Sequence, residues 1–200
     1  MEPFGLAELA AVLASHRTWL ESNAHSGARA VLVDRDLRGA RLAEVDLRGA
    51  DLAGALLDDA NLFRARLTGV RLHRASLRGA RLMHAELAGA NLISANLVGA
   101  ALVGADLAGA RLVLADLSEV DLYDARLDGA ELKGARLVGA DLRKCGLRGA
   151  VLAAADLDRC RLDECDLRGA RLESARNLTP EQLAVARWDD TTTLPAGMGC

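Results

Sequence analysis

Residues 90–109 read ANLISANLVGAALVGADLAG, and the rule that orders this stretch governs most of the chain. A leucine stands at every fifth position from Leu32 to Leu172, 29 times without an insertion or deletion. Two positions before each leucine lies a small residue: alanine in 22 repeats, and valine or cysteine in all the others except the one that has Arg35. An internal repeat of this length determines the fold before any local signal is considered.

A period of five fits neither a helix, which needs apolar residues at 3.6-residue spacing, nor a long strand, which needs them at every second residue. It does fit a short extended stretch followed by a turn. The small residue and the leucine are two positions apart, so in an extended stretch both side chains point to the same side. We therefore expect these two positions to face inward and the other three positions of each repeat to face water.

The glycines show how many repeats complete one coil. Every fourth leucine is followed, two residues later, by a glycine in each of seven successive cases: Gly49, Gly69, Gly89, Gly109, Gly129, Gly149 and Gly169. This 20-residue period predicts four repeats per coil. Glycine at the third position of a turn predicts a positive φ and a type II turn there. On the side that is poor in glycine we expect turns with a negative φ.

The repeats Ala50–Gly54 and Ala90–Ser94 have the form A(D/N)LXX, and over about residues 30–176 the chain resembles the pentapeptide-repeat family. The resemblance implies an all-β repeat solenoid, a right-handed quadrilateral (square) parallel β-helix of about seven coils. Coils stacked about 4.8 Å apart would form a rod about 35 Å long. Both ends of such a rod expose unpaired backbone, so each end needs a cap.

Segments outside the repeats supply the caps. Residues 1–29 are predicted to form an amphipathic cap helix and a linker, whose apolar residues at helical spacing should cover the first coil: Leu6, Leu9, Ala10, Leu13 and Leu20. Residues 177–200 are predicted to form a second cap helix and a loose tail. Thr179, Pro180 and Gln182 have the pattern of a helix start with a capping box. Leu183 and Trp188 should then pack on the last coil or form contacts of a dimer.

Composition excludes several classes of protein. The net charge is −3 and aromatic residues make up 2% of the chain, so no basic, aromatic-rich surface for nucleic acid is expected. No run of 18 apolar residues is present, which argues against a membrane span. The first apolar stretch contains Glu8 and lacks a basic start, unlike a signal peptide. We expect a soluble cytoplasmic protein.

No catalytic, cofactor-binding or metal-binding residues are expected. Flat walls do not gather the convergent groups that catalysis or metal binding requires. The four histidines are predicted to be solvated: His16, His25, His73 and His84. Cys145, Cys160 and Cys165 occupy inward positions, where we expect reduced thiols that act as small apolar residues. The fourth cysteine, Cys200, lies in the predicted tail.

Function must then reside on the outer surface. The residues that directly follow the leucines in the glycine-poor register form an apolar stripe over consecutive coils: Phe63, Met83, Val103 and Tyr123. A contiguous exposed stripe often marks an interface, although side chains stacked on adjacent rungs can also serve to stabilise one another. A second, weaker stripe on the adjacent face consists of Ile93, Val113 and Leu114. These residues make a protein-binding scaffold the first hypothesis.

The resemblance supplies the alternative hypothesis. Some members of the family bind DNA gyrase or topoisomerase IV as acidic, rod-shaped mimics of duplex DNA, protect against quinolones or other topoisomerase poisons, and dimerise through their C-terminal ends. The most acidic side of this chain would be the corresponding surface: Asp36, Asp58, Asp59, Asp116, Glu119, Asp156 and Asp158. Four arginines on the same side reduce its net charge to about −3. Duplex DNA of the same length carries about twenty charges, so this magnitude counts against strong mimicry.

Overall fold

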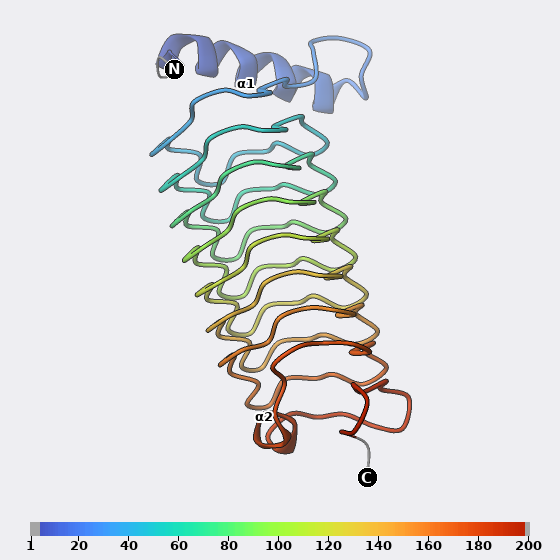
Figure 1. The fold of residues 1–200 in the computed structure, drawn as a ribbon. Helices are drawn as coiled ribbons and strands as arrows, with labels where there is room; N and C mark the ends of the chain where they lie inside the picture. The colour runs from blue at the N-terminus through green and yellow to red at the C-terminus, as the bar shows by residue number, and fades with distance from the viewer. Residues whose placement is uncertain (1–4, 199–200) are drawn as a thin grey trace.

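The computed structural model describes residues 5–198, and within them the chain forms a stack of coils with a helix at each end (Figure 1). Helix α1 spans Leu6–Glu21 and helix α2 spans Pro180–Ala184. Between them, every strand is a single-residue parallel bridge to the residue 20 positions later, from Val31↔Asp51 to Asp156↔Arg176. The described chain is thus a four-sided β-helical solenoid, with four five-residue repeats in each coil.

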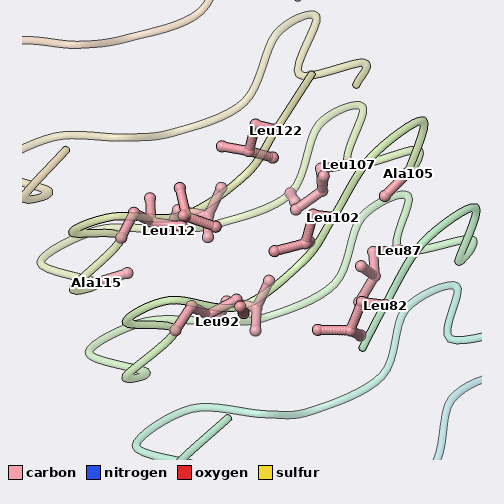
Figure 2. Close-up of a cluster of buried hydrophobic side chains, with 14 of the residues drawn as sticks. Leu82, Leu87, Leu92, Leu102, Ala105, Leu107, Leu112, Ala115 and Leu122 are labelled. Atoms are coloured by element: carbon pink, nitrogen blue, oxygen red, sulfur yellow. The ribbon is translucent and has the colours of Figure 1, made fainter. Parts of the chain in front are cut away.

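The inward positions build one continuous core. All 29 repeat leucines are at most 3% exposed. Figure 2 shows several of them, such as Leu82, Leu92 and Leu112, with side chains that point into the coil. Burial of each leucine contributes roughly 2 kcal/mol. Backbone N–H groups donate to the next coil, as in the 2.8 Å bond from Leu62 N to Arg81 O. The expected inward pair of positions is confirmed, because the alanines, valines and cysteines before the leucines are buried in nearly every repeat.

The corners of the coil are the same on all four sides. The N–H of the next small residue donates to the carbonyl of the leucine, as in the 3.0 Å bond from Ala65 N to Leu62 O. The residue two after the leucine has a positive φ in all 29 repeats, for example 66° at Gly129 and 53° at Arg64. A positive φ at the third turn residue alone is the signature of a type II turn.

The prediction of a negative φ on the glycine-poor side is therefore wrong. Coils stack in register, so the ladder imposes one turn geometry on every corner, whichever residue stands there. Non-glycine residues such as Glu44, Lys144 and Leu114 adopt φ values of 58–59°. An L-residue in this left-handed region loses about 1–2 kcal/mol of conformational stability.

Helix α1 lies across the open end of the first coil (Figure 1). Its buried residues are Leu9 and His16, with Val12 and Leu13 partly buried against the core. Leu6 is 84% exposed and Ala10 is exposed too, so the prediction that both cover the first coil is wrong. The buried face instead follows positions 9, 12, 13 and 16, which are one helical turn apart.

His16 belongs to this buried face, so its predicted solvation is also wrong. It is fully buried, and its Nδ1 accepts a 3.1 Å hydrogen bond from the N–H of Ala30. Its ring stacks on Trp19 with centroids 5.5 Å apart. The Nε2 atom is buried without a hydrogen-bond partner among the described residues. Burial lowers the pKa of His16, so the neutral ring is the form that docks α1 onto the coil.

Helix α2 begins with the capping box that the sequence predicts. The Thr179 hydroxyl accepts from the N–H of Gln182, and the Gln182 side chain accepts from the N–H of Thr179. The Gln182 Nε2 atom also donates to the carbonyls of Leu157 (3.0 Å) and Cys160 (2.9 Å), which ties the helix to the coil below it. Leu183 is buried at 5% exposure, as predicted, whereas Trp188 is 41% exposed and is not a buried residue of the cap.

The tail is less loose than the sequence suggests. Arg187 forms a bridge to Asp166, and Thr193 forms one to Arg171, so the chain after α2 continues the ladder for a further partial coil. The Thr192 hydroxyl is buried and donates to the carbonyl of Leu167 at 3.0 Å. Cys145, Cys160 and Cys165 are buried free thiols, and burial raises the pKa of both Cys145 and Cys160 to about 12. Cys200 lies outside the described residues.

Candidate protein-binding surface

The four corners are numbered here by the leucine that precedes each of them. Corner 1 follows Leu32 and every twentieth residue after it, corner 2 follows Leu37, corner 3 follows Leu42 and corner 4 follows Leu47. Side chains at one corner of successive coils lie one rung apart, about 4.8 Å. Residues 20 positions apart in sequence are therefore direct neighbours along the rod.

The stripe of Phe63, Met83, Val103 and Tyr123 lies along corner 3. Ladder bonds place its members on successive rungs: the N–H of Arg64 donates to Met83 O, and the N–H of His84 donates to Val103 O, both at 3.0 Å. All four side chains are half-buried. The structure thus brings together the four residues that the sequence grouped.

Arginine and lysine side chains, with the ring of one histidine, cover both ends of this stripe. The Arg64 guanidinium lies 5.2 Å from the centre of the Phe63 ring, and the His84 ring meets Phe63 edge-on at 6.1 Å. At the other end, Arg143 and Lys144 lie 5.4 and 5.5 Å from the centre of the Tyr123 ring. Cation–π contacts of this kind contribute about 0.5–1 kcal/mol each at exposed sites. The stripe therefore has an aliphatic centre between two aromatic rings, each of which is contacted by cationic side chains. At the Tyr123 end, Arg143 is also paired with Asp141 at 2.6 Å, whereas Lys144 has no such ion pair among the described residues.

The second apolar stripe lies at corner 1, diagonally opposite the first stripe, so its predicted place on the adjacent face is wrong. Ile93 and Val113 are half-buried, whereas Leu114 is 65% exposed with a φ of 58°. Among the described residues, the other exposed large hydrophobic side chains all lie near the ends of the rod: Leu6, Val31, Val33, Val185 and Trp188. Leu114 is thus unusual in its exposure at the middle of the rod, whereas its positive φ is common to this turn position in every repeat.

The acidic residues on the side of corner 2 serve largely to hold local structure. Asp36 is buried and accepts 2.9 and 2.6 Å bonds from Arg38, which lower the pKa of its carboxyl to about 2. Asp116 accepts from both the N–H and the hydroxyl of Ser118, and Asp58 accepts from the hydroxyl of Ser76.

Further toward the C-terminal end of the same side, Asp156 accepts a 2.8 Å bond from the Asn177 amide. Asp158 pairs with Arg159 at 3.0 Å, while Asp59 and Glu119 are exposed. Of the seven acidic candidates, five therefore use their carboxylates to bind nearby groups: Asp36, Asp58, Asp116, Asp156 and Asp158. The charge that this side offers to a partner is correspondingly smaller than its composition suggests.

The sequence predicts only that aspartate and asparagine face water, but in the structure they also form a hydrogen bond that shapes the corner. When either residue directly precedes the leucine, its side-chain oxygen accepts from the N–H two residues later, at the start of the corner. Examples are Asn61 with Phe63 at 3.2 Å and Asp121 with Tyr123 at 3.1 Å. The signal was present in the A(D/N)LXX form of the repeat, because these two side chains favour such turns.

Side chains of alternating charge pair with one another along the side that precedes corner 4. Arg66 pairs with Asp46 at 2.9 Å and with Glu86 at 3.7 Å, and Arg126 pairs with Asp106 at 3.2 Å. These exposed pairs contribute little individually. Residues 5–198 contain no group of three His, Cys, Asp or Glu side chains placed to hold a metal ion. Neither α1 nor α2 has the length and apolar character that crossing a membrane requires.

The model of the family described as pentapeptide repeats matches the chain in overlapping segments from residue 28 to residue 173, with eight copies. The chain belongs to the pentapeptide-repeat family. No curated protein sequence is significantly similar to it.

Solved structures of pentapeptide-repeat proteins resemble this one. HetL, from the cyanobacterium Nostoc sp. strain PCC 7120, is 26% identical, with a TM-score of 0.57 over 96% of this chain and 91% of HetL. Its description is that of a pentapeptide-repeat protein involved in the regulation of heterocyst differentiation.

Two trypsin-treated variants of QnrB1, a plasmid-mediated fluoroquinolone resistance protein, have TM-scores of 0.72 and 0.68 at 16% and 17% identity. Each alignment covers 82% of this chain and 88% or 86% of the QnrB1 variant. Because the identity is so low, the comparison with QnrB1 shows a shared β-helical fold and gives no information about a shared function.

Proposed function

We propose that this right-handed, four-sided rod is a non-catalytic scaffold that binds a protein partner through corner 3. The observation that carries the proposal is the stripe of Phe63, Met83, Val103 and Tyr123, an apolar strip over four consecutive rungs with cations at both ends. Aromatic, methionine and arginine side chains are the residues enriched at protein interfaces. Free thiols at Cys145, Cys160 and Cys165 are usual in a reducing compartment, which supports a cytoplasmic location.

The regulatory role in the description of HetL supports a protein-binding function of this kind, since HetL is aligned over nearly the whole chain. Binding to DNA gyrase or topoisomerase IV is the alternative, and the charge distribution gives it less support. Its acidic side has a net charge of only about −3, and five of the seven carboxylates there are already engaged in local bonds. A supercoiling titration with purified protein, with and without a quinolone, tests this alternative. Inhibition or protection at micromolar protein would establish it.

A matched pair of substitutions tests the scaffold function. Val103 and Val98 are both half-buried valines directly after a repeat leucine, but Val103 lies at corner 3 and Val98 at corner 2. Affinity enrichment from cells that naturally make the protein should compare Met83→Ser/Val103→Ser with Val98→Ser. The amount of a partner recovered with the wild type should fall at least tenfold with Met83→Ser/Val103→Ser and stay unchanged with Val98→Ser. Equal retention with both variants would refute binding through corner 3.

A further inference from the structure

A second candidate site lies at corner 1, diagonally opposite the stripe. An open hollow of about 370 Å³ is lined there by His73, Arg74, Asn91, Ile93 and Ser94. Arg74 and Ser94 occupy the same turn position on successive rungs, since the N–H of Arg74 donates to Ile93 O at 3.0 Å. The small Ser94 side chain leaves the space between Arg74 and the protruding Leu114 on the next rung.

The polar groups around this hollow are hydrogen-bond donors without partners. The Arg74 guanidinium forms no ion pair or hydrogen bond with any residue in 5–198, and neither does the Ser94 hydroxyl. The Asn91 side-chain oxygen accepts from the N–H of Ile93 at 3.3 Å, which leaves its amide N–H groups available. The Nδ1 atom of His73 is buried, so Nε2 is the ring nitrogen that can meet a ligand.

Electrostatics favour an anion at this position. The coil of residues 62–81 contains six arginines and no acidic residue: Arg64, Arg66, Arg71, Arg74, Arg78 and Arg81. Arg66 and Arg71 are neutralised by Asp46 and Asp51 of the preceding coil. The hollow lies beside Arg74, which has no such partner, and no carboxylate lines it. An arginine with free donors matches the planar, two-oxygen geometry of a carboxylate.

An apolar surface continues from the hollow toward the C-terminal end of the rod. Ile93, Val113 and Leu114 lie on the two rungs beyond Arg74, and Leu114 exposes 65% of its surface. Leu114 keeps a φ of 58°, which glycine would adopt more easily. The φ follows from the ladder, as at every other corner, but an exposed leucine in the middle of the rod is accounted for if a ligand covers it.

We propose that this hollow binds the carboxylate of an acidic side chain in a partner peptide, with an apolar side chain two residues later resting on Val113 and Leu114. In an extended peptide, side chains two residues apart point to the same side and lie about 6.8 Å apart. This spacing is close to the distance of about one and a half rungs, roughly 7 Å, from the hollow to Leu114. The site extends the proposed scaffold function to a second surface, and it does not depend on the stripe at corner 3.

The test is a titration of the isotope-labelled full chain with the tripeptide Ac-Asp-Gly-Leu-NH2, followed by amide NMR shifts. We expect saturable shifts at Ile93, Ser94 and Leu114, with a Kd on the order of millimolar for so small a ligand. The peptides Ac-Asn-Gly-Leu-NH2 and Ac-Asp-Gly-Ala-NH2 should bind at least fivefold more weakly. Tighter binding of inorganic phosphate than of the tripeptide would overturn the peptide assignment.

Matched variants locate the site. Arg74→Gln should weaken binding at least fivefold, whereas Arg64→Gln should not, although both arginines occupy the same turn position of one coil. Ser94→Leu should fill the hollow and abolish the shifts, and Ser174→Leu, at the same position four coils later, should not. Leucine is tolerated at this position, as Leu114 shows. Equal effects of the two arginine variants, or no shifts at corner 1 up to about 20 mM peptide, would refute the proposal. Neither result would bear on partner binding through corner 3.

Discussion

The aspartates that precede the repeat leucines should be needed for their hydrogen-bonding oxygen and not for their charge. Asp121 is the cleanest case, because it is half-buried, accepts the N–H of Tyr123 at 3.1 Å and forms no ion pair among the described residues. Loss of such a bond costs about 1 kcal/mol. Asp121→Ala should therefore lower the free energy of unfolding by about 1 kcal/mol, or Tm by about 2–4 °C for a chain of this size.

Asp121→Asn should be neutral to within about 0.3 kcal/mol, because an amide oxygen can accept the same bond. Asn61, Asn91 and Asn96 do so in this structure at 3.1–3.3 Å. Asp163→Ala is the control, since Asp163 is exposed and its side chain forms no hydrogen bond or ion pair within residues 5–198. It should change stability by less than about 0.5 kcal/mol.

Urea unfolding of the four proteins, followed by circular dichroism, measures these differences. The reasoning would be refuted if Asp121→Asn were as destabilising as Asp121→Ala, because charge would then be the property that matters. A neutral Asp121→Ala would refute it equally. The result also bears on function, since carboxylates kept for corner geometry, such as Asp116, need no partner to explain them.

Three further predictions concern the corners, the N-terminal cap and the thiols. Gly129→Ala should lower the free energy of unfolding by about 1 kcal/mol because of its φ of 66° alone, since a Cβ there meets no atom within 4 Å. Gly27→Ala should lower it by at least about 2 kcal/mol, because its Cβ would lie 2.4 Å from Ser15 O and 2.7 Å from Trp19 N of α1. Urea unfolding measures both values, and equal losses would contradict the packing described for the cap. Burial lowers the pKa of His16 below 6.5, so protonation favours the unfolded chain. The contribution of neutral His16 to stability should be complete above pH 6.5 and decline as the pH falls through the folded-state pKa. Between pH 7.5 and pH 5 the free energy of unfolding should fall more for the wild type than for His16→Gln, and identical decreases would exclude this role. The raised pKa values of Cys145 and Cys160 also predict that the folded Cys200→Ser variant does not react with a thiol reagent at pH 8, whereas the unfolded variant exposes three reactive thiols. Rapid labelling of the folded protein would contradict the burial of these cysteines.

The sequence predicts the coil well because the fold depends on one pattern of inward-facing residues that recurs in every repeat. Each repeat places a small residue and a leucine two positions apart, and 29 repetitions average out any local exception such as Arg35. The corner geometry was less predictable. Side chains such as those of Glu44 and Leu114 prefer a negative φ in isolation, but the ladder between coils imposes the left-handed conformation on them.

The caps were predictable in kind but not in their contacts. The capping box of Thr179 and Gln182 is a local interaction, so sequence spacing reveals it. The burial of His16 and the exposure of Leu6 and Trp188 depend on how each end of the chain meets a coil, and this is tertiary information. Likewise, the apolar stripe follows from the period alone. The hollow at Ser94 depends on the size differences between neighbouring rungs, which a repeat pattern does not display.

The central proposal, that a protein partner binds along corner 3, is tested most directly by site-specific photo-crosslinking in the cells that make the protein. A photoreactive residue at Val103 should be compared with the same residue at Val98, one repeat away on corner 2. The scaffold account predicts a discrete crosslinked partner from position 103, lost on Met83→Ser, and none from position 98. The same partner crosslinked equally from both positions, or from position 98 alone, would contradict it.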